Sequence, residues 1–333
     1  MTGTPQAPYF DSALGVWILS RFSDVSTALH RPELWPVGPN GEGQLDVEDR
    51  NSQAKRRTHV LAELHAGKIT GWKSEFAPVA DRIATALPLN RAIDVLGEFA
   101  RPWSLLLAAK VVRIDASRAQ SLVASAAKVT AATADPDNPA LKAEAAASGA
   151  ELDKAFFDSR LPMAGPAFIA LSQTLPCLLA NAWLILLNYP EEMERIRSNS
   201  DLLPKAVEEL LRLAGLARVL HRRATADVKL GKILIESGQR VNLMLVIANH
   251  DPEQFAHPDR LDLSRRTIGH FALGASEHSC AAASLIRMAM GVATGTFAGQ
   301  FIPAKQSDPV QWLGGSGFRW PAAVYARRRP ERD

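Results

Sequence analysis

The chain has 333 residues, of which 47% are hydrophobic, and its formal net charge is +3 at pH 7. This length and composition allow a sizeable buried core, and they exclude an intrinsically disordered chain. The small net charge argues against a nucleic acid partner. Two cysteines cannot form a disulfide framework, so we expect a protein of the reducing cytoplasm.

The N-terminal half is predicted to contain a short strand followed by helices. The apolar run Val16–Leu19 indicates the strand, and a helix with a serine cap is expected to begin at Ser23. A second, basic helix continues through Leu64. An alanine-rich helical pattern then covers residues 92–157, with a break at 135–139.

A long uncharged segment, residues 161–189, comes next. It is long enough to span a bilayer, but Pro166, Pro176 and Asn181 are among the residues that interrupt it. We therefore expect a helix buried on all sides at the centre of the protein, with no membrane span. Pro176 is expected to kink this helix or to open it locally.

The C-terminal part contains a loop, residues 270–280, that ends at Cys280 and precedes a run of good helix formers. At the start of a helix, unpaired N–H groups and the helix dipole favour a thiolate, so Cys280 is a candidate metal ligand. A lone thiolate suits a haem iron better than zinc, which takes three or four protein ligands. The alternative is that Cys280 is a small buried hydrophobic residue.

The loop resembles the haem-binding loop of the cytochrome P450 family, Phe-Gly-x-Gly-x-His-x-Cys-x-Gly followed by Leu-Ala-Arg. The matching residues are Gly274, His278, Cys280, Leu285 and Arg287, and the departures are Leu273, Ser276, Ala282 and Ile286. Residues 248–263 are also similar to bacterial members of the family. The resemblance covers nearly the whole chain and is strongest from about residue 170 to residue 287.

The resemblance implies a mainly α fold with a minor β-sheet region, the cytochrome P450 fold, as a single haem-thiolate domain over residues 1–333. It implies haem b (iron protoporphyrin IX) between the central helix and the loop, with Cys280 as the axial ligand. The other implied cofactor-binding residues are Arg57, Arg222, His278 and Gln53 at the propionates, together with Gly274 and Ala170. A buried structural cluster of Glu209, Arg212 and Arg260 is implied behind the haem.

The central helix departs from the family pattern at an informative position. Residues 170–174 fall on the family's Ala-Gly-x-Asp/Glu-Thr, so Thr174 matches and Gln173 replaces the acid. A carboxylate can relay protons to bound oxygen, whereas an amide is neither acid nor base near neutral pH. The implied catalytic residues are Thr174 and Gln173, and the implied substrate pocket contains Phe168, Ile169, Leu216, Ala217, Arg218, Val219 and residues 313–316.

The expected function is that of a haem-thiolate monooxygenase that oxidises a small hydrophobic organic molecule in biosynthetic tailoring or catabolism. A ferredoxin or flavodoxin would supply electrons, and Lys55, Arg56 and Arg287 are candidate docking residues for it. Because Gln173 replaces the acid, peroxide-driven oxidation or an oxygen-independent rearrangement, dehydration or coupling remains an alternative. A haem-binding protein without catalysis and a helical scaffold without haem also remain open.

Overall fold

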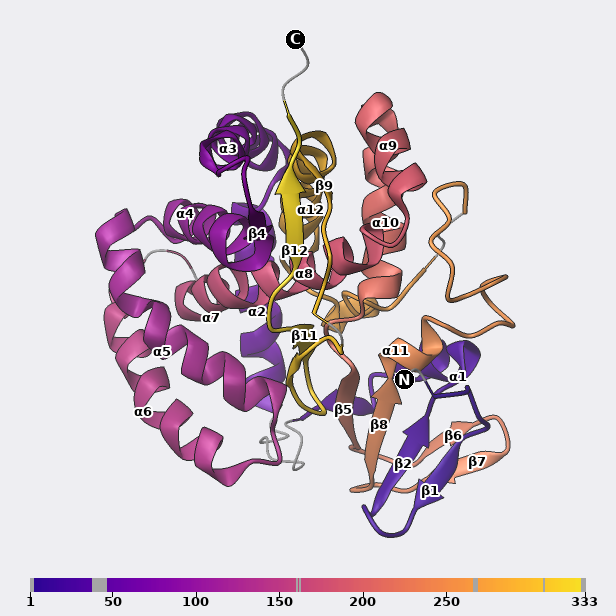
Figure 1. The fold of residues 1–333 in the computed structure, drawn as a ribbon. Helices are drawn as coiled ribbons and strands as arrows, with labels where there is room; N and C mark the ends of the chain where they lie inside the picture. The colour runs from indigo at the N-terminus through magenta and orange to yellow at the C-terminus, as the bar shows by residue number, and fades with distance from the viewer. Residues whose placement is uncertain are drawn as a thin grey trace.

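The structure is a computed structural model that describes residues 3–37, 47–159, 161, 163–265, 269–307 and 309–330; the side chains of 47–51 and 53 are not described. Helices make up most of it; the largest sheet lies at one end, and a small three-stranded sheet lies among the helices (Figure 1). The expected mainly α fold with a minor β-sheet region is confirmed. The helices are α1 (Phe22–Leu29), α2 (Val47–Glu63), α3 (Ala66–Ala86), α4 (Arg101–Val112), α5 (Ala116–Ala134), α6 (Pro139–Ala155), α7 (Ala164–Ile169), α8 (Leu175–Leu186), α9 (Pro190–Ser198), α10 (Leu203–Ala214), α11 (Leu245–Ala248) and α12 (Ala283–Gln300).

The strands form small sheets, and the largest has the order β1-β2-β8-β5-β3. In it β2 runs parallel to β8, and the other neighbours are antiparallel. The predicted strand Val16–Leu19 is confirmed as β2. The strands are β1 (Tyr9–Asp11), β2 (Val16–Leu19), β3 (Leu34–Pro36), β4 (Ala92–Asp94), β5 (Val219–Ala224), β6 (Val228–Leu230), β7 (Ile233–Ile235), β8 (Arg240–Met244), β9 (Phe301–Pro303), β10 (Trp312–Gly314), β11 (Arg319–Pro321) and β12 (Tyr325–Arg328).

Two hydrophobic clusters form the core of the protein. The smaller one lies between the five-stranded sheet and α1, where Leu19, Val25 and Val241 are buried with Phe271 from the Cys280 loop. The larger one joins the helices. In it the Trp183 ring is stacked between those of Phe99 and Phe297, with ring centroids 5.4 and 4.6 Å apart. The Cys280 loop therefore has one end anchored on the sheet and continues into the helical core at α12.

The central helix is built from α7, a π-helical turn η2 (Ala170–Thr174) and α8. Figure 1 shows α8 in the middle of the helical region, and it contacts α4, α10 and α12. By length and composition Ala164–Leu186 could cross a membrane, but 72% of its most apolar window is buried inside the protein. The prediction of a buried central helix is confirmed.

Helix α1 begins one residue before the predicted serine cap. The N–H of Phe22 donates to the Asp251 carboxylate at 2.8 Å, and no side chain caps the helix from within its own segment. A residue more than two hundred positions away therefore replaces the expected Ser23 cap.

Helices α5 and α6 pair along one side of the molecule (Figure 1). The predicted break between them is confirmed, because α5 ends at Ala134 and Asn138 caps α6. The Ala134 carbonyl accepts hydrogen bonds from the N–H groups of Gly317 and Phe318, at 3.0 and 3.2 Å. The tip of the β10–β11 hairpin is thereby fixed to the α5–α6 turn.

Candidate active site

The Cys280 loop folds back on itself through two local features. Gly274 has a φ of +71°, and a Cβ there would lie 3.3 Å from the Ser279 Cα, so the position favours glycine. The N–H of Cys280 donates to the Leu273 carbonyl at 2.8 Å. Ser276, where the family pattern has a second glycine, also has a positive φ of 56°. The backbone of the loop thus fixes the position of Cys280.

Cys280 is exposed, and α12 begins three residues later, at Ala283. The surrounding protein nevertheless raises the pKa of the thiol through burial, which outweighs a hydrogen bond from the Ala282 backbone and the charges of Arg57 and Arg287. Both observations hold if the sulfur is open on one side and enclosed on the others. The prediction of a thiolate at a helix start is therefore wrong for the chain alone, and metal binding would have to displace the thiol proton.

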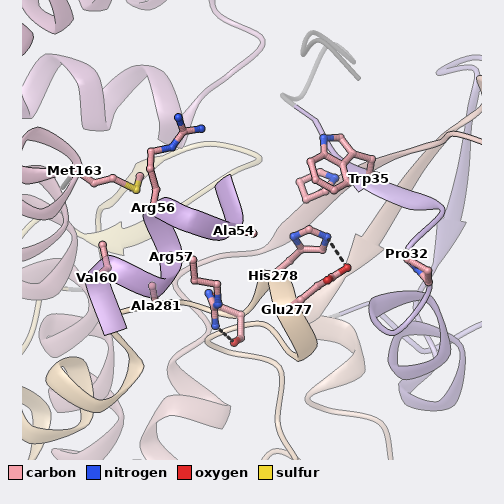
Figure 2. Close-up of a pocket in the computed structure, with 12 residues that line it drawn as sticks. Pro32, Trp35, Ala54, Arg56, Arg57, Val60, Met163, Glu277, His278 and Ala281 are labelled. Carbon is pink, nitrogen blue, oxygen red and sulfur yellow. Dashed lines mark hydrogen bonds and ion pairs between the residues drawn. The ribbon is translucent and has the colours of Figure 1, made fainter. Parts of the chain in front are cut away.

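A pocket of about 690 Å³ lies beside Cys280 and includes Ser279 and Ala281, the residues on either side of it. Figure 2 shows Arg57 reaching from α2 to the loop, where its guanidinium donates to the Ser279 carbonyl and, at 2.9 Å, to the Ser279 hydroxyl. His278 faces the same pocket and meets the edge of Trp35, with ring centroids 5.1 Å apart. Two predicted propionate-binding residues and both neighbours of the predicted ligand thus share one pocket.

Arg222 on β5 is only 5% exposed, and burial lowers the pKa of its guanidinium to about 10. Its Nη1 donates to the His221 carbonyl at 3.0 Å. Among the described residues it has no carboxylate partner. Because a buried cation without a counter-charge is unfavourable, this position is suited to a carboxylate supplied by a ligand.

The π-helical turn η2 shows what Pro176 does to the central helix. The N–H of Leu175 bonds to the carbonyl of Ala170, five residues back, and Pro176 has no N–H with which to restore the α-helical pattern. The predicted local opening is confirmed. Within the turn, Ala170 and Thr174 are partly accessible, whereas the three residues between them, Leu171–Gln173, are buried.

Gln173 is turned toward α4, where its Oε1 lies 3.5 Å from Nη1 of Arg101. Its Nε2 lies 3.4 Å from the Ser172 hydroxyl. Both are long contacts, so Gln173 is held by weak hydrogen bonds in a buried position. Arg101 was not identified from the sequence, because no local spacing relates it to Gln173.

Behind the loop, Glu209 and Arg212 form a fully buried ion pair at 2.8 Å. The second guanidinium on Glu209 is that of Arg265, at 2.9 Å. Arg260 was expected in this place, but its side chain is exposed and only its carbonyl takes part. The expectation for Arg260 is therefore corrected to Arg265, which the Asp262-x-x-Arg265 turn directs back toward Glu209.

Glu208 makes a second connection that sequence reasoning missed. Its carboxylate lies 3.1 Å from His270 Nε2 and accepts hydrogen bonds from Arg287, the shorter at 2.7 Å. Burial raises the pKa of Glu208, but the bonds from His270 and Arg287 outweigh it and lower the pKa to about 2. Arg287, expected as a docking residue for an electron donor, is thus paired within the chain, and Glu208 connects both flanks of the loop.

The predicted substrate-pocket residues fall into two groups. Phe168 and Leu216 are buried, and Phe168 packs on Phe156. Ile169 and residues 217–219 are half-buried, and Leu313 is 38% exposed. Ala217 pairs with Phe318, so the structure brings residues 216–219 and the hairpin that carries 313–316 together. The side chain of Gln53 lies outside the described part of the chain.

Comparisons with known proteins find relatives that match most of the chain. A family model described as "Cytochrome P450" matches residues 189–266. Cytochrome P450 107B1 of Saccharopolyspora erythraea is 26% identical over 90% of this chain and 86% of its own length. Vitamin D(3) 25-hydroxylase of Pseudonocardia autotrophica is 26% identical over 84% of this chain and 79% of its own.

Among solved structures, P450BioI in complex with an acyl carrier protein has a TM-score of 0.85 to this chain, at 20% identity. The match covers 97% of this chain and 94% of P450BioI, so the two share the cytochrome P450 fold. With the family model and the curated relatives, this shows that the chain belongs to the cytochrome P450 family of oxidoreductases.

Proposed function

We propose that this protein is a haem b monooxygenase that oxidises a small, largely hydrophobic organic molecule, in biosynthetic tailoring or in catabolism. The observation that carries the proposal is the position of Cys280. Its side chain is exposed, and its two neighbours line a pocket with Arg57 and His278. A thiol fixed beside the Arg57 guanidinium and the His278 imidazole matches a cofactor that combines a metal with carboxylates.

The residues present fit haem b. Cys280 would hold the iron, and Arg222, which has no carboxylate partner among the described residues, would pair with one propionate. Arg57 and His278 would hold the propionates from the pocket side, with Gln53 assisting. When bound, haem supplies the iron at which oxygen is activated, and a thiolate ligand favours O–O cleavage.

On the central helix, Thr174 and Ala170 are the accessible members of the η2 turn. The Thr174 hydroxyl can donate and accept hydrogen bonds, so it is suited to hold a water molecule and to pass on a proton. The half-buried Ile169, Ala217 and Val219 supply apolar surface for the substrate.

The test is the absorption spectrum of the reduced carbonyl complex after haem supplementation. The wild-type protein is expected to show the spectrum of thiolate-ligated haem, and Cys280→Ala is expected to lose it. Cys177→Ala is the matched control, because Cys177 is the other cysteine and is buried in α8. An unchanged spectrum in Cys280→Ala would refute the ligand assignment. A wild-type protein that retains no haem would refute it as well.

The proposal includes a cytoplasmic location and a separate ferredoxin or flavodoxin. Lys55 and Arg56 are exposed on α2, and Arg56 lines the same pocket as the Cys280 loop, so both are suited to an acidic partner. Charge reversal of both is expected to slow reductase-driven turnover at low salt and to leave the carbonyl spectrum unchanged.

A second candidate reaction uses peroxide, or no oxygen at all, on the same haem. The observation that favours it is Gln173, a buried amide that contacts Arg101 and cannot relay a proton. Gln173→Glu would place a carboxylate beside that guanidinium. If oxygen and a reductase are used, Gln173→Glu is expected to raise or preserve turnover. Wild-type turnover with peroxide but not with oxygen and a reductase would favour the second candidate.

A further inference from the structure

Two arginines lie together where the start of β5 meets the β10–β11 hairpin. Ala217 and Phe318 form an antiparallel bridge, and the N–H of Arg218 donates to the Gly317 carbonyl at 2.9 Å. In such a ladder Arg218 lies opposite Gly317, and Arg319 is its diagonal neighbour on the same face. Diagonal neighbours are about 7–8 Å apart, within reach of two long side chains.

Neither guanidinium is neutralised by a carboxylate of the described residues. Arg218 and Arg319 are both half-buried, and among the described residues neither forms an ion pair or a side-chain hydrogen bond. Arg319 lies over the Trp312 ring, 4.6 Å from its centroid. Burial lowers the pKa of Arg218, and the charge of Arg319 lowers it further. Two like charges at a half-buried site destabilise each other unless an anion lies between them.

Two acids lie near the hairpin tip. At the hairpin tip, Asp137 accepts a hydrogen bond from the Ser316 hydroxyl at 3.3 Å, and Asp135 lies against Gly315. Within the described ranges neither of them pairs with Arg218 or Arg319. The two cations therefore differ from Arg212, Arg265 and Arg287, each of which bonds to a carboxylate of the chain.

We propose that Arg218 and Arg319 bind an anionic group of the substrate, a carboxylate or a phosphate, with Trp312 as an aromatic wall. Paired guanidinium groups hold such anions through charge-assisted hydrogen bonds. The inference rests on the proposed function, which assigns residues 216–219 and the β10–β11 hairpin to the substrate pocket. The substrate is thus an amphipathic anion instead of a purely hydrophobic molecule.

The fold also limits the separation between the two ends of that substrate. Asn181 on α8 donates to the Arg319 carbonyl at 2.9 Å. Thr174 lies seven residues earlier on the same helix, about 10 Å along its axis. The Arg319 backbone and Thr174 are therefore on the order of 10 Å apart, a distance that an alkyl chain of the substrate can span.

Titration calorimetry with dodecanoate, dodecyl phosphate and dodecan-1-ol tests the proposal on the haem-loaded protein. The wild-type protein is expected to bind one or both anions at least about tenfold more tightly than the alcohol. Which anion binds more tightly distinguishes a carboxylate from a phosphate. In the double variant Arg218→Gln, Arg319→Gln, anion affinity is expected to fall about 10- to 100-fold, with alcohol affinity unchanged.

Arg195→Gln is the matched control, since Arg195 is half exposed on α9 and pairs with Glu192. Arg319→Lys retains the charge and is expected to keep part of the preference for anions. It keeps the proposal testable if the double variant misfolds. A preference for anions that survives in the double variant, or that falls equally in Arg195→Gln, would overturn the proposal.

The carbonyl spectrum of the same preparations separates the two proposals. A thiolate spectrum without any preference for anions refutes the anion site and leaves the proposed function intact. A preference for anions that depends on both arginines, without a thiolate spectrum, supports the site and refutes the haem assignment.

Discussion

Buried arginines on the two sides of the Cys280 loop have different surroundings. Behind the loop, Arg212 and Arg265 both bond to the buried carboxylate of Glu209. On the pocket side, Arg222 is also buried, but among the described residues its partner is the neutral carbonyl of His221. The half-buried Arg218 and Arg319 likewise have no carboxylate partner in the described part of the chain.

The difference separates the structural role of a buried charge from its binding role. A guanidinium with a carboxylate inside the chain holds the fold together, and removing one partner leaves an uncompensated charge. A guanidinium without one is unfavourable until a ligand supplies the anion. Removing the charge should therefore lower the stability of the protein in the first group of arginines, and should leave it unchanged or raise it in the second.

The largest expected effect is that of Glu209→Gln. Arg212 has no exposed side-chain surface, so loss of the carboxylate leaves its charge, and that of Arg265, buried without compensation. We expect the free energy of unfolding to fall by about 3–5 kcal/mol, measured as a lower urea midpoint. Glu192→Gln on α9 removes a surface pair instead and is expected to cost about 0.5 kcal/mol or less. Equal costs would contradict the structural role of Glu209.

The next prediction concerns Arg222, where removal of the charge should not destabilise the protein. Arg222→Met removes a buried charge that the described residues do not neutralise, so the haem-free protein is expected to be as stable as the wild type or more stable. Haem is expected to leave the variant about tenfold faster or more, because a propionate loses its partner. The measurements are the urea midpoint without haem and the rate of haem transfer to an acceptor protein. Arg222→Lys retains the charge and should be intermediate. Destabilisation of the haem-free Arg222→Met protein would place Arg222 with the structural arginines.

A smaller effect is expected at Glu208, which holds both flanks of the loop. Glu208→Gln weakens the bonds to His270 and Arg287 and is expected to cost about 1–2 kcal/mol near neutral pH, since the pair is partly exposed. The folded pKa of about 2 lies below the ordinary glutamate pKa of 4.5, so this contribution is complete above pH 4.5 and is lost as the pH falls toward 2.

The difference in urea midpoint between wild type and Glu208→Gln should therefore narrow from pH 4.5 downward. A difference that is constant over this range would mean that the Glu208 charge is not responsible for it. The haem-free protein suffices for this measurement, because both flanks of the loop are held by the chain itself.

The sequence predicted well those features that depend on local pattern. The opening of the central helix follows from Pro176 alone, and the tight loop before Cys280 follows from Gly274, whose positive φ suits glycine. Pairings between distant elements could not be read in this way. Arg260 and Arg265 are five residues apart on one loop, and a hydrogen bond from the Ser264 N–H to Asp262, at 2.9 Å, decides which of them reaches Glu209.

The protonation of the Cys280 thiol also could not be predicted from the sequence. A helix start favours a thiolate, but the helix begins at Ala283 and the enclosing protein has the larger effect on the pKa. The same limit applies to Arg218. Its place among the pocket residues came from the sequence, but its pairing with Arg319, one hundred and one positions away, depends on the bridge between Ala217 and Phe318.

The smallest expected effect concerns Ser276, where the family pattern has glycine. Its left-handed backbone costs a non-glycine residue about 1 kcal/mol, while its hydroxyl donates to the Leu29 carbonyl at 2.5 Å. Ser276→Gly removes both contributions and should change the free energy of unfolding by less than about 1 kcal/mol. Ser276→Ala keeps the backbone cost and loses the bond, so it should destabilise by about 1 kcal/mol in urea unfolding. If Ser276→Ala were as stable as the wild type, the bond to Leu29 would not offset the backbone strain.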